Sequence, residues 1–440
     1  MRNTTRLKDN EENTLSPLIG DGCDYVWMGI NRLVRGFITN IFITFLSNRV
    51  ARDGVQPTLP PNPNRLAMKT IIIPLIALTL TSNIFSIDSK VASTATEMFM
   101  KNPQHSGLKL NGAGNLHVGH FGLLLVAENG GSIVAIDTKD TGTFKAVKPV
   151  TNLSAKIAGA IGTTAGKVTI NDLKANPETG TVYISVSRSD GISAIITLNA
   201  SGKLAALDVG KLNWVRVKLA NKLKISRISD LGLAPGRVLA AGQSNDAFRS
   251  KIFSIPTPIE HGSLAHIYST DTYHVAHGRW ETKAPIQSFI MTQEAGNPYM
   301  VGSFACTPIA KFPLGNLKSG GKVKGTSVLE LGSGNRPLDM FTYKSGGKQW
   351  LVTHTMRFHK PFAYTPSKYW AARIDMRHIA ASEEDKTNKQ AYRRDKSQAK
   401  DPKGVEVVKE LHGAVQVDAY GKQGAILLRE SGNLEIVQLP

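Results

Sequence analysis

A pattern that returns six times is the feature of this sequence that most limits its fold. Its clearest copy begins at Ile170-Asn171-Asp172-Leu173 and continues through two alternating runs, residues 181–187 and 192–198, between turns rich in Gly, Pro and Asn. Alternation with a period of two residues predicts antiparallel strands joined as a meander. Each copy carries one anchor residue near its start, and the six anchors are Asn115, Asp172, Asp230, Ser288, Asp339 and Asp418.

The spacing of these anchors predicts a β-propeller. They lie 57, 58, 58, 51 and 79 residues apart. Radially repeated four-stranded sheets produce long periods of this kind, because each blade buries its faces against its neighbours. Forty Gly and 21 Pro supply turns, and a 41 % apolar content supplies a core. We therefore expect an all-β fold at residues 94–440, a β-propeller of six four-stranded blades, or seven if residues near 93–110 join a terminal strand.

The same alternation predicts the other strands of the repeat, and these strands are residues 122–127, 132–136, 237–241, 251–255, 299–303, 309–312, 349–354, 425–429 and 434–439. The widest interval between anchors holds a charged insertion at residues 380–404. Runs of mixed charge favour a solvated helix or loop over a buried strand.

The N-terminal part of the chain predicts export. Met68-Lys69-Thr70 precedes an apolar run at residues 71–80 and then small polar residues, the layout of a secretory signal at 68–93. Residues 1–67 then form an N-terminal extension, translated from an upstream start codon. Alternatively, residues 26–47 form an interfacial amphipathic helix, followed by a proline-rich linker. The expected location is periplasmic or extracellular, with a membrane anchor if this leader is retained.

Two cysteines and a basic charge limit the function. Removal of the leader takes Cys23 with it and leaves Cys306 without a partner, so no intrachain disulfide is expected. The formal net charge of +19 admits anionic partners, but no run of five Lys or Arg occurs, which argues against nucleic acid. Motifs for α/β-hydrolases, zinc metalloproteases, P-loop nucleotide binding and haem attachment are absent.

The repeat resembles the broad group of secreted β-propellers that includes lactonase-like and quinoprotein-dehydrogenase-like proteins. The resemblance covers most of the chain after the leader and carries no family-defining motif. It implies a fold and leaves the activity open.

Propeller geometry places the start of each repeat at one rim of a central channel, so the six anchors are predicted to line it. Four aspartates in equivalent positions could hold calcium through oxygen. Alternatively, each Asp caps its own turn by accepting backbone N–H groups. The loop before Ser288 and the turns after second strands are predicted to reach the same rim.

These loops contain the candidate ligand-binding residues, which are His274, His277, Arg279, Trp280, Glu281, Cys306, Arg336, His354 and His359. Imidazole, thiol and carboxylate ligands suit zinc, copper or iron, with His274, His277, His354 and His359 as the predicted metal ligands. Ordinary hydrogen bonds are the alternative for each histidine. The arginines favour instead an anionic ligand stacked on Trp280. We expect all of these side chains at one shared mouth.

Three functions follow as hypotheses. The first is an exported propeller that binds a ligand or partner protein at this rim, with no catalytic residue assigned. The second is a metal-dependent propeller enzyme, lactonase-like or oxidoreductase-like, in which Glu128, Asn171 and Asp230 partly imitate the lactonase ligands. The third is an envelope scaffold that binds an anionic polymer. The sequence leaves the oligomeric state open.

Overall fold

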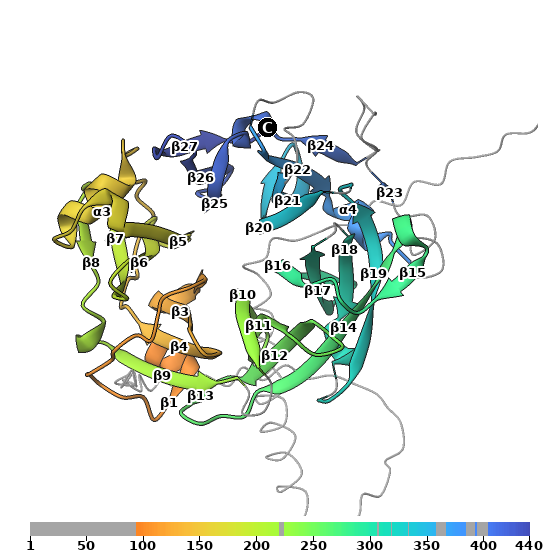
Figure 1. Ribbon diagram of the computed structural model, residues 1–440, viewed down its shortest axis with the longest axis horizontal. Coiled ribbons are helices and arrows are strands. Elements are labelled where there is room, and N and C mark those ends of the chain that lie inside the picture. Colours follow the sequence, from red (N-terminus) through yellow and green to blue (C-terminus); the bar gives the residue numbers. More distant parts are fainter. Residues whose placement is uncertain are drawn as a thin grey trace, which may run out of the picture. The chain divides into compact units, whose positions relative to one another are not determined.

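The structure is a computed structural model, and the residues that it describes are 94–219, 224–305, 308–317, 319–332, 334–357, 367–383, 392–393 and 404–440 (Figure 1). The predicted extension 1–67 and signal-like segment 68–93 lie outside these residues, as do Cys23 and most of the insertion 380–404. The described part of the chain contains no helix long and apolar enough to span a membrane.

Six repeat units are recognised by their innermost strands, and we number them 1 to 6 in chain order. Unit 1 comprises β2 (Leu116–Val118), β3 (Leu123–Glu128), β4 (Ser132–Asp137) and β9 (Asn213–Lys218). Unit 2 comprises β5 (Val168–Ala175), β6 (Val182–Arg188), β7 (Ser193–Leu198) and β8 (Leu204–Ala206). Unit 5 comprises β20 (Asn335–Ser345), β21 (Lys348–Arg357), β22 (Tyr369–Asp375) and β24 (Val405–Val407). Unit 6 is a three-stranded sheet of β25 (Ala414–Tyr420), β26 (Gly424–Arg429) and β27 (Leu434–Gln438).

Units 3 and 4 are joined in one ten-stranded sheet. Unit 3 comprises β10 (Ile225–Ala234), β11 (Arg237–Ser244), β12 (Ser250–Pro256) and β14 (His266–His274). Unit 4 comprises β16 (Ile286–Glu294), β17 (Asn297–Phe304), β18 (Pro308–Pro313) and β19 (Lys322–Glu330). The outer strands β14 and β19 pair in parallel and join the two units. Two short strands, β15 (Arg279–Glu281) and β23 (Tyr392–Arg393), add to β14 and β19 respectively.

Few helices accompany the sheets in the part of the chain that the structure describes. The α-helices are α2 (Ala95–Phe99), α3 (Leu153–Ala160) and α4 (Met376–Ala380). The 3₁₀ turns are η1 (His120–Gly122), η2 (Ala165–Lys167), η3 (Val209–Lys211), η4 (Val275–His277), η5 (Leu314–Asn316) and η6 (Lys409–Leu411). β1 (Met100–Lys101) pairs with β13 (Ile259–Glu260) in a separate two-stranded sheet.

The six innermost strands form a closed ring, but not in chain order. Contacts run from β5 to β2, β10, β16, β20 and β25, and from β25 back to β5 (Figure 1). Unit 1 therefore lies between units 2 and 3, and unit 2 lies between units 1 and 6. The cause is a return of the chain: after building unit 2 it adds β9 to the outer edge of β4.

The ring closes between units 6 and 2. Val150, ahead of unit 2, forms an antiparallel bridge with Leu434 of β27. The Tyr420 hydroxyl accepts from the Val147 N–H at 2.7 Å and donates to the Gly180 carbonyl at 2.9 Å. Buried backbone groups of two distant segments are thus satisfied by one side chain of β25, which ties the last unit to the second.

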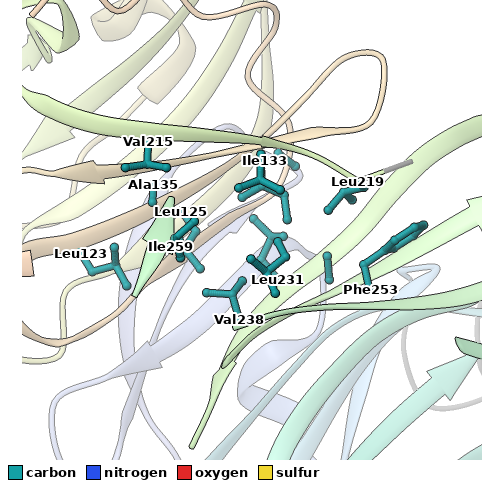
Figure 2. Packing of buried hydrophobic residues seen from close by; sticks show 14 of the residues in the cluster. Leu123, Leu125, Ile133, Ala135, Val215, Leu219, Leu231, Val238, Phe253 and Ile259 are labelled. Atoms are coloured by element: carbon teal, nitrogen blue, oxygen red, sulfur yellow. The ribbon is translucent and has the colours of Figure 1, made fainter. Parts of the chain in front are cut away.

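The apolar core lies between neighbouring sheets, as period-two alternation requires. On β3, Leu123 and Leu125 pack with Leu231 and Phe253 of unit 3 (Figure 2). Leu124 and Val126 face the other way and pack with Tyr183 and Ile195 of unit 2. Each sheet is therefore buried on both faces, which is how radial sheets stabilise one another.

This all-β, propeller-like arrangement confirms the predicted fold class, and the strands predicted within the repeat appear within three residues of their expected bounds. The prediction of six separate four-stranded blades is not met, because units 3 and 4 share one sheet and unit 6 has three strands. Residues 94–110 contribute α2, β1 and a bridge from Gln104 to Trp214, and form no seventh blade in the described structure.

Candidate functional site

Four of the predicted anchors converge on a lysine that the sequence analysis did not single out. Lys174 lies on β5, two residues after Asp172 and therefore on the same face of the strand. Its ammonium is 3.0 Å from Asp339 Oδ1 and 4.0 Å from Asp418 Oδ1. The charges of Asp172 and Asp230 also act on it. These four aspartates and Lys174, which we call the channel cluster, come from units 2, 3, 5 and 6.

The aspartates are held by hydrogen bonds that cross between units. Asp172 Oδ2 accepts from the Leu116 N–H of unit 1 at 2.7 Å. Asp230 Oδ2 accepts from the Ser288 hydroxyl at 2.6 Å and the Phe289 N–H at 2.8 Å, both of unit 4. The alternative in which each Asp caps its own turn describes part of this: Oδ1 of Asp172 and of Asp230 accepts the N–H of the next residue, while Oδ2 accepts from a neighbouring unit.

A β-bulge precedes the anchor in most units and sets its direction. The ladder shifts register just before Asp172, Asp230, Ser288 and Asp339, each of which begins the next regular stretch of pairs. In β25 the first pair after the shift is Gln416 with Leu428. Gln416 is thus the structural equivalent of the other anchors, and the predicted anchor Asp418 lies two residues further along the strand.

Calcium does not fit the channel cluster. A hard cation needs six to eight oxygen ligands. Here the ammonium of Lys174 lies among the carboxylates, and Asp172, Asp230 and Asp418 each accept a backbone N–H. The predicted calcium ring is corrected accordingly: lysine supplies the positive charge.

Burial and charge shift the pKa values within this cluster in opposite directions. Burial raises the pKa of Asp172 to about 7 and that of Asp230 to about 6, although Lys174 acts against both shifts. Burial would also raise the pKa of Asp339, but the adjacent ammonium of Lys174 and the nearby His354 hold it at about 2. Asp339 is therefore the permanent counter-ion of Lys174, while Asp172 titrates near neutral pH.

A cavity of about 300 Å³ opens beside this cluster, lined by all six innermost strands. Lys174, Asp230 and Asp418 form its polar part together with His117. Burial lowers the pKa of His117 to about 4, so its imidazole is neutral at pH 7. Its apolar walls include Leu231, Leu233, Phe289, Met291 and Phe341.

A second cavity, of about 410 Å³, lies where the innermost strands of units 1, 2 and 3 begin. Its lining includes Asn115, Glu128, Asn171 and Arg227. Glu128 is paired with Arg216 at 2.8 Å, and Asn171 donates to the Ala113 carbonyl and the Ser187 hydroxyl. Asp230 lies at the first cavity, so Glu128, Asn171 and Asp230 do not form the lactonase-like set.

The predicted His/Arg mouth divides into two separate groups. His274, His277, Arg279, Trp280 and Glu281 come together on the β14–β15 hairpin at the outer edge of unit 3. The hairpin, with Gly278 in the left-handed region (φ +64°), joins residues that the i, i+3, i+7 spacing had placed on a helix face. Among the described residues, His274, His277 and Glu281 form a group with metal-binding geometry, their ligand atoms within 4.8 Å of one another.

His354 and Arg336 lie in the other group, near the channel. His354 is fully buried on β21, where its Nε2 bonds the Ala414 carbonyl at 2.8 Å and its Nδ1 is 4.0 Å from Asp339. The Arg336 guanidinium donates to Gln287 at 3.2 Å. The prediction that His354 meets His277 is wrong, because one side chain faces the ring of innermost strands and the other an outer edge. Cys306 and His359 lie outside the described residues.

Sequence reasoning missed three polar residues of these sites. Lys174 could have been found from its place two residues after an anchor. His117 follows the first anchor in the same way, two residues after Asn115. Glu330 is buried, with Oε1 3.6 Å from His274 Nε2. No sequence pattern points to it, because it lies on β19 of the next unit.

No family model matches the chain, and no curated protein matches it. Solved structures are similar at low identity. The β-propeller domain of Cps50 (Swd1) from Myceliophteria thermophila is 9 % identical, with a TM-score of 0.29 over 77 % of this chain and 98 % of that chain. A carbohydrate-active enzyme of family AA12 from Trichoderma reesei is 12 % identical, with a TM-score of 0.31 over 78 % and 98 %. A GH93 α-L-arabinofuranosidase of Fusarium graminearum is 9 % identical, with a TM-score of 0.31 over 68 % and 97 %.

Similarities with TM-scores this low carry no argument about function. The fold assignment rests on the strand pairing and ring contacts of this chain. The comparisons give no support for the lactonase-like and quinoprotein-dehydrogenase-like group that the repeat resembles.

Proposed function

We propose that this chain is a six-bladed propeller that binds a small organic cation at the mouth of its central channel. The observation that carries the proposal is the 300 Å³ cavity, because side chains of all six innermost strands line it. A pocket with apolar walls, a few convergent polar groups and perturbed pKa values is the usual form of a small-molecule site.

The six-blade count rests on the closed ring of innermost strands. Each of the six begins a meander, and each contacts two others of the set. Units 3 and 4 then count as two blades whose outer strands, β14 and β19, have paired edge to edge. The short strand β23 pairs with Leu329 and Glu330, on a part of β19 that β14 does not reach and where an open strand would invite association.

The charge of the cavity favours a cationic ligand. Asp230 and Asp418 line it, and Lys174 is the lysine among its lining residues. That lysine is already paired with Asp339, whose pKa is held low. Arg227, three residues before Asp230 on β10, also carries a positive charge, but it lines the second cavity. A ligand ammonium beside Asp230 and Asp418 would compensate carboxylates whose pKa values burial has raised.

The walls specify the rest of the ligand. Leu233, Phe289, Met291 and Phe341 offer apolar and aromatic surface, with no charge on that side of the cavity. An aromatic or branched aliphatic body of roughly ten heavy atoms would fill a cavity of this size. The polar head would point toward Asp418, and the body toward unit 4.

A matched ligand series tests the proposal. Phenethylammonium, 2-phenylethanol and phenylacetate differ in charge and little in shape, and isothermal titration calorimetry measures their affinities for the full chain. The ammonium is expected to bind at least tenfold tighter than the alcohol, a difference of about 1.4 kcal/mol, and phenylacetate more weakly than both. Equal or tighter binding of phenylacetate would contradict a cation site.

Two variants test whether the ligand binds in this cavity. Asp418→Asn removes the charge at similar volume and is expected to erase the preference for ammonium over alcohol. Asp208→Asn is the matched control, because Asp208 is exposed, pairs with Lys211 and does not line the cavity. Loss of the preference in the control, or its survival in Asp418→Asn, would assign binding to another surface.

Export is a separate proposal that depends on the segment 68–93 alone. N-terminal sequencing of the mature protein from a secreting host would test it. Cleavage near residue 93 is the expected result, and an intact N-terminus in the cytosolic fraction is the opposing one.

A further inference from the structure

We propose that the β14–β15 hairpin binds one zinc ion through His274, His277 and Glu281, with Glu330 as a positioning carboxylate. This site lies at the outer edge of unit 3 and does not depend on the channel ligand. It combines two imidazoles and one carboxylate, ligands that zinc accepts in sites with one open position.

Strand register brings His274 and Glu281 to one face, and the η4 turn between the two strands carries His277. His274 is paired with Arg279, and Thr272 with Glu281, so His274 and Glu281 are diagonal neighbours on the ribbon. The opposite face carries Tyr273 and Trp280, whose rings pack edge to face at 5.6 Å between centroids. This aromatic pair holds the two strands together and leaves the His/Glu face free for a ligand.

The short distances among the three groups do not fit two separate, linear hydrogen bonds at His277 Nδ1. His277 Nδ1 lies 2.7 Å from His274 Nδ1 and 2.6 Å from Glu281 Oε1. An imidazole nitrogen has a single in-plane position, which carries either one proton or one lone pair. If His277 Nδ1 donates to Glu281, it has no lone pair left to accept from His274.

A metal ion removes this conflict. Ligand atoms on tetrahedral zinc, with bonds of roughly 2.0–2.1 Å, lie about 3.3 Å apart. The two Nδ1 atoms are 2.7 Å apart, His277 Nδ1 is 2.6 Å from Glu281 Oε1, and His274 Nδ1 is 3.6 Å from the other carboxylate oxygen, Oε2. Small shifts of these side chains would bring both nitrogens and one carboxylate oxygen to that geometry. All three atoms then point lone pairs at one cation.

Glu330 fixes the tautomer that binding requires. Its carboxylate, only 1 % exposed, accepts the Val275 N–H at 2.5 Å and faces His274 Nε2 at 3.6 Å. A proton on Nε2 directed at this carboxylate leaves the lone pair of His274 on Nδ1, toward His277 and Glu281. Histidine ligands of metals are commonly oriented by a carboxylate in this manner.

Access to the site is open on one side. His274 is buried and Glu281 mostly so, but the His277 side chain is 45 % exposed. Arg279 is largely exposed and only 3.4 Å from Glu281 Oε1, and it can turn away into solvent when a cation replaces it. The fourth position on zinc would therefore hold water.

Zinc titration of the full chain, after treatment with chelator and dialysis, tests the assignment. Calorimetry is expected to give one zinc per chain, and the visible spectrum of the cobalt-loaded protein a four-coordinate site. His277→Ala and Glu281→Gln should each weaken binding at least 30-fold. His120→Ala is the matched control, because His120 forms an exposed pair with Glu178 at 2.9 Å and should leave binding unchanged.

Glu330→Gln tests the positioning role. A 10- to 100-fold loss of zinc affinity is expected, with the cobalt spectrum retained. Circular dichroism of each variant separates lost binding from lost fold. One zinc per chain bound with parental affinity by the double variant His277→Ala, Glu281→Gln would overturn the assignment, and so would no zinc bound by the folded parent chain.

Discussion

The channel cluster and the β14–β15 hairpin are both groups of polar side chains among apolar sheets. They differ in how these side chains find hydrogen-bond and ion-pair partners. In the channel, Asp172, Asp230 and Asp418 accept N–H groups of neighbouring strands, and Asp339 is paired with Lys174. In the hairpin, His277 Nδ1 faces two partners and can satisfy one. The first group has a lysine and backbone donors of its own, and the proposed ligand ammonium would add to them, whereas the second is the proposed site of a zinc ion.

This difference follows from the position of each group relative to the repeat. Among the recurring aspartates, Asp172, Asp230 and Asp418 each accept an N–H group from an adjacent unit, so they serve the contacts between neighbouring units. The hairpin is an addition between units 3 and 4, with no counterpart among the predicted strands of the other units. We infer that recurring polar residues here maintain the ring, and that residues outside the repeat carry site-specific chemistry.

Removal of Lys174 is expected to reduce the stability of the chain more than any other substitution considered. Lys174→Met keeps the volume but leaves buried carboxylates without their cation, which is expected to cost about 3–5 kcal/mol of unfolding free energy. Urea unfolding at pH 7 measures the loss, and at pH 5 the loss should shrink because the carboxylates can protonate. The exposed pair Lys211–Asp208 gives the control, Lys211→Ala, with a change within about 0.5 kcal/mol. Equal effects of the two substitutions would mean that the channel cluster is not compensated by Lys174.

Tyr420→Phe tests the closure of the ring. The substitution leaves the Val147 N–H and the Gly180 carbonyl without their partner, and both lie among buried residues. An expected loss of about 2–3 kcal/mol follows from two unsatisfied backbone groups. Tyr268→Phe is the control, since Tyr268 is equally buried and no hydrogen bond of its hydroxyl occurs among the described residues. A loss no greater than in this control would remove Tyr420 from the closure.

Asp172 should make the stability of the ring depend on pH. Its folded pKa, about 7, lies above the ordinary value of 3.8, so the folded state is favoured below pH 3.8 and loses this advantage as pH rises through 7. Between pH 5 and 7 the parent should lose about 2 kcal/mol of unfolding free energy through this group. Asp339 acts in the opposite direction, but its window lies between about pH 4 and 2.

Urea unfolding of the parent and of Asp172→Asn at pH 5, 6 and 7 checks this expectation. The stability of the variant relative to the parent should rise with pH over this range, whatever its absolute stability. His117, whose pKa burial lowers to about 4, acts in the opposite direction in both proteins, so the difference between parent and variant isolates Asp172. A difference that stays constant from pH 5 to 7 would show that Asp172 keeps one protonation state throughout.

The sequence predicted the recurring parts of this molecule and missed the parts that depend on neighbours. Alternation placed the second and third strands, and the anchors pointed to the channel. The order of the units around the ring was not predictable, because β9 joins β4 across the whole of unit 2 and no local pattern records that pairing. Asp418 was misplaced by two residues because a bulge in β25 is invisible to spacing.

The candidate hairpin site was half predicted for a similar reason. His274, His277 and Glu281 are near in sequence, so spacing suggested that they meet, although by way of a helix. Glu330 comes from a strand about fifty residues later, and only the parallel pairing of β14 with β19 brings it to His274. The sequence analysis placed His354 with the metal ligands because imidazole suits a metal. Its burial beside the Ala414 carbonyl could not be predicted from the sequence.

The two histidines of the hairpin are expected to differ in how much each stabilises the metal-free chain. This difference tests whether the hairpin is independent of the ring. His277 is half exposed, and its described contacts are with His274 and Glu281 of the same hairpin, so His277→Ala should change the unfolding free energy of the metal-free chain by less than about 0.5 kcal/mol. His274 is buried beside Glu330, and His274→Ala should cost about 1–3 kcal/mol because it leaves that carboxylate with one partner fewer. Urea unfolding in the presence of chelator measures both. If His277→Ala destabilised the metal-free chain as much as His274→Ala, the hairpin would be a structural part of unit 3, and zinc would not be needed to explain its polar residues.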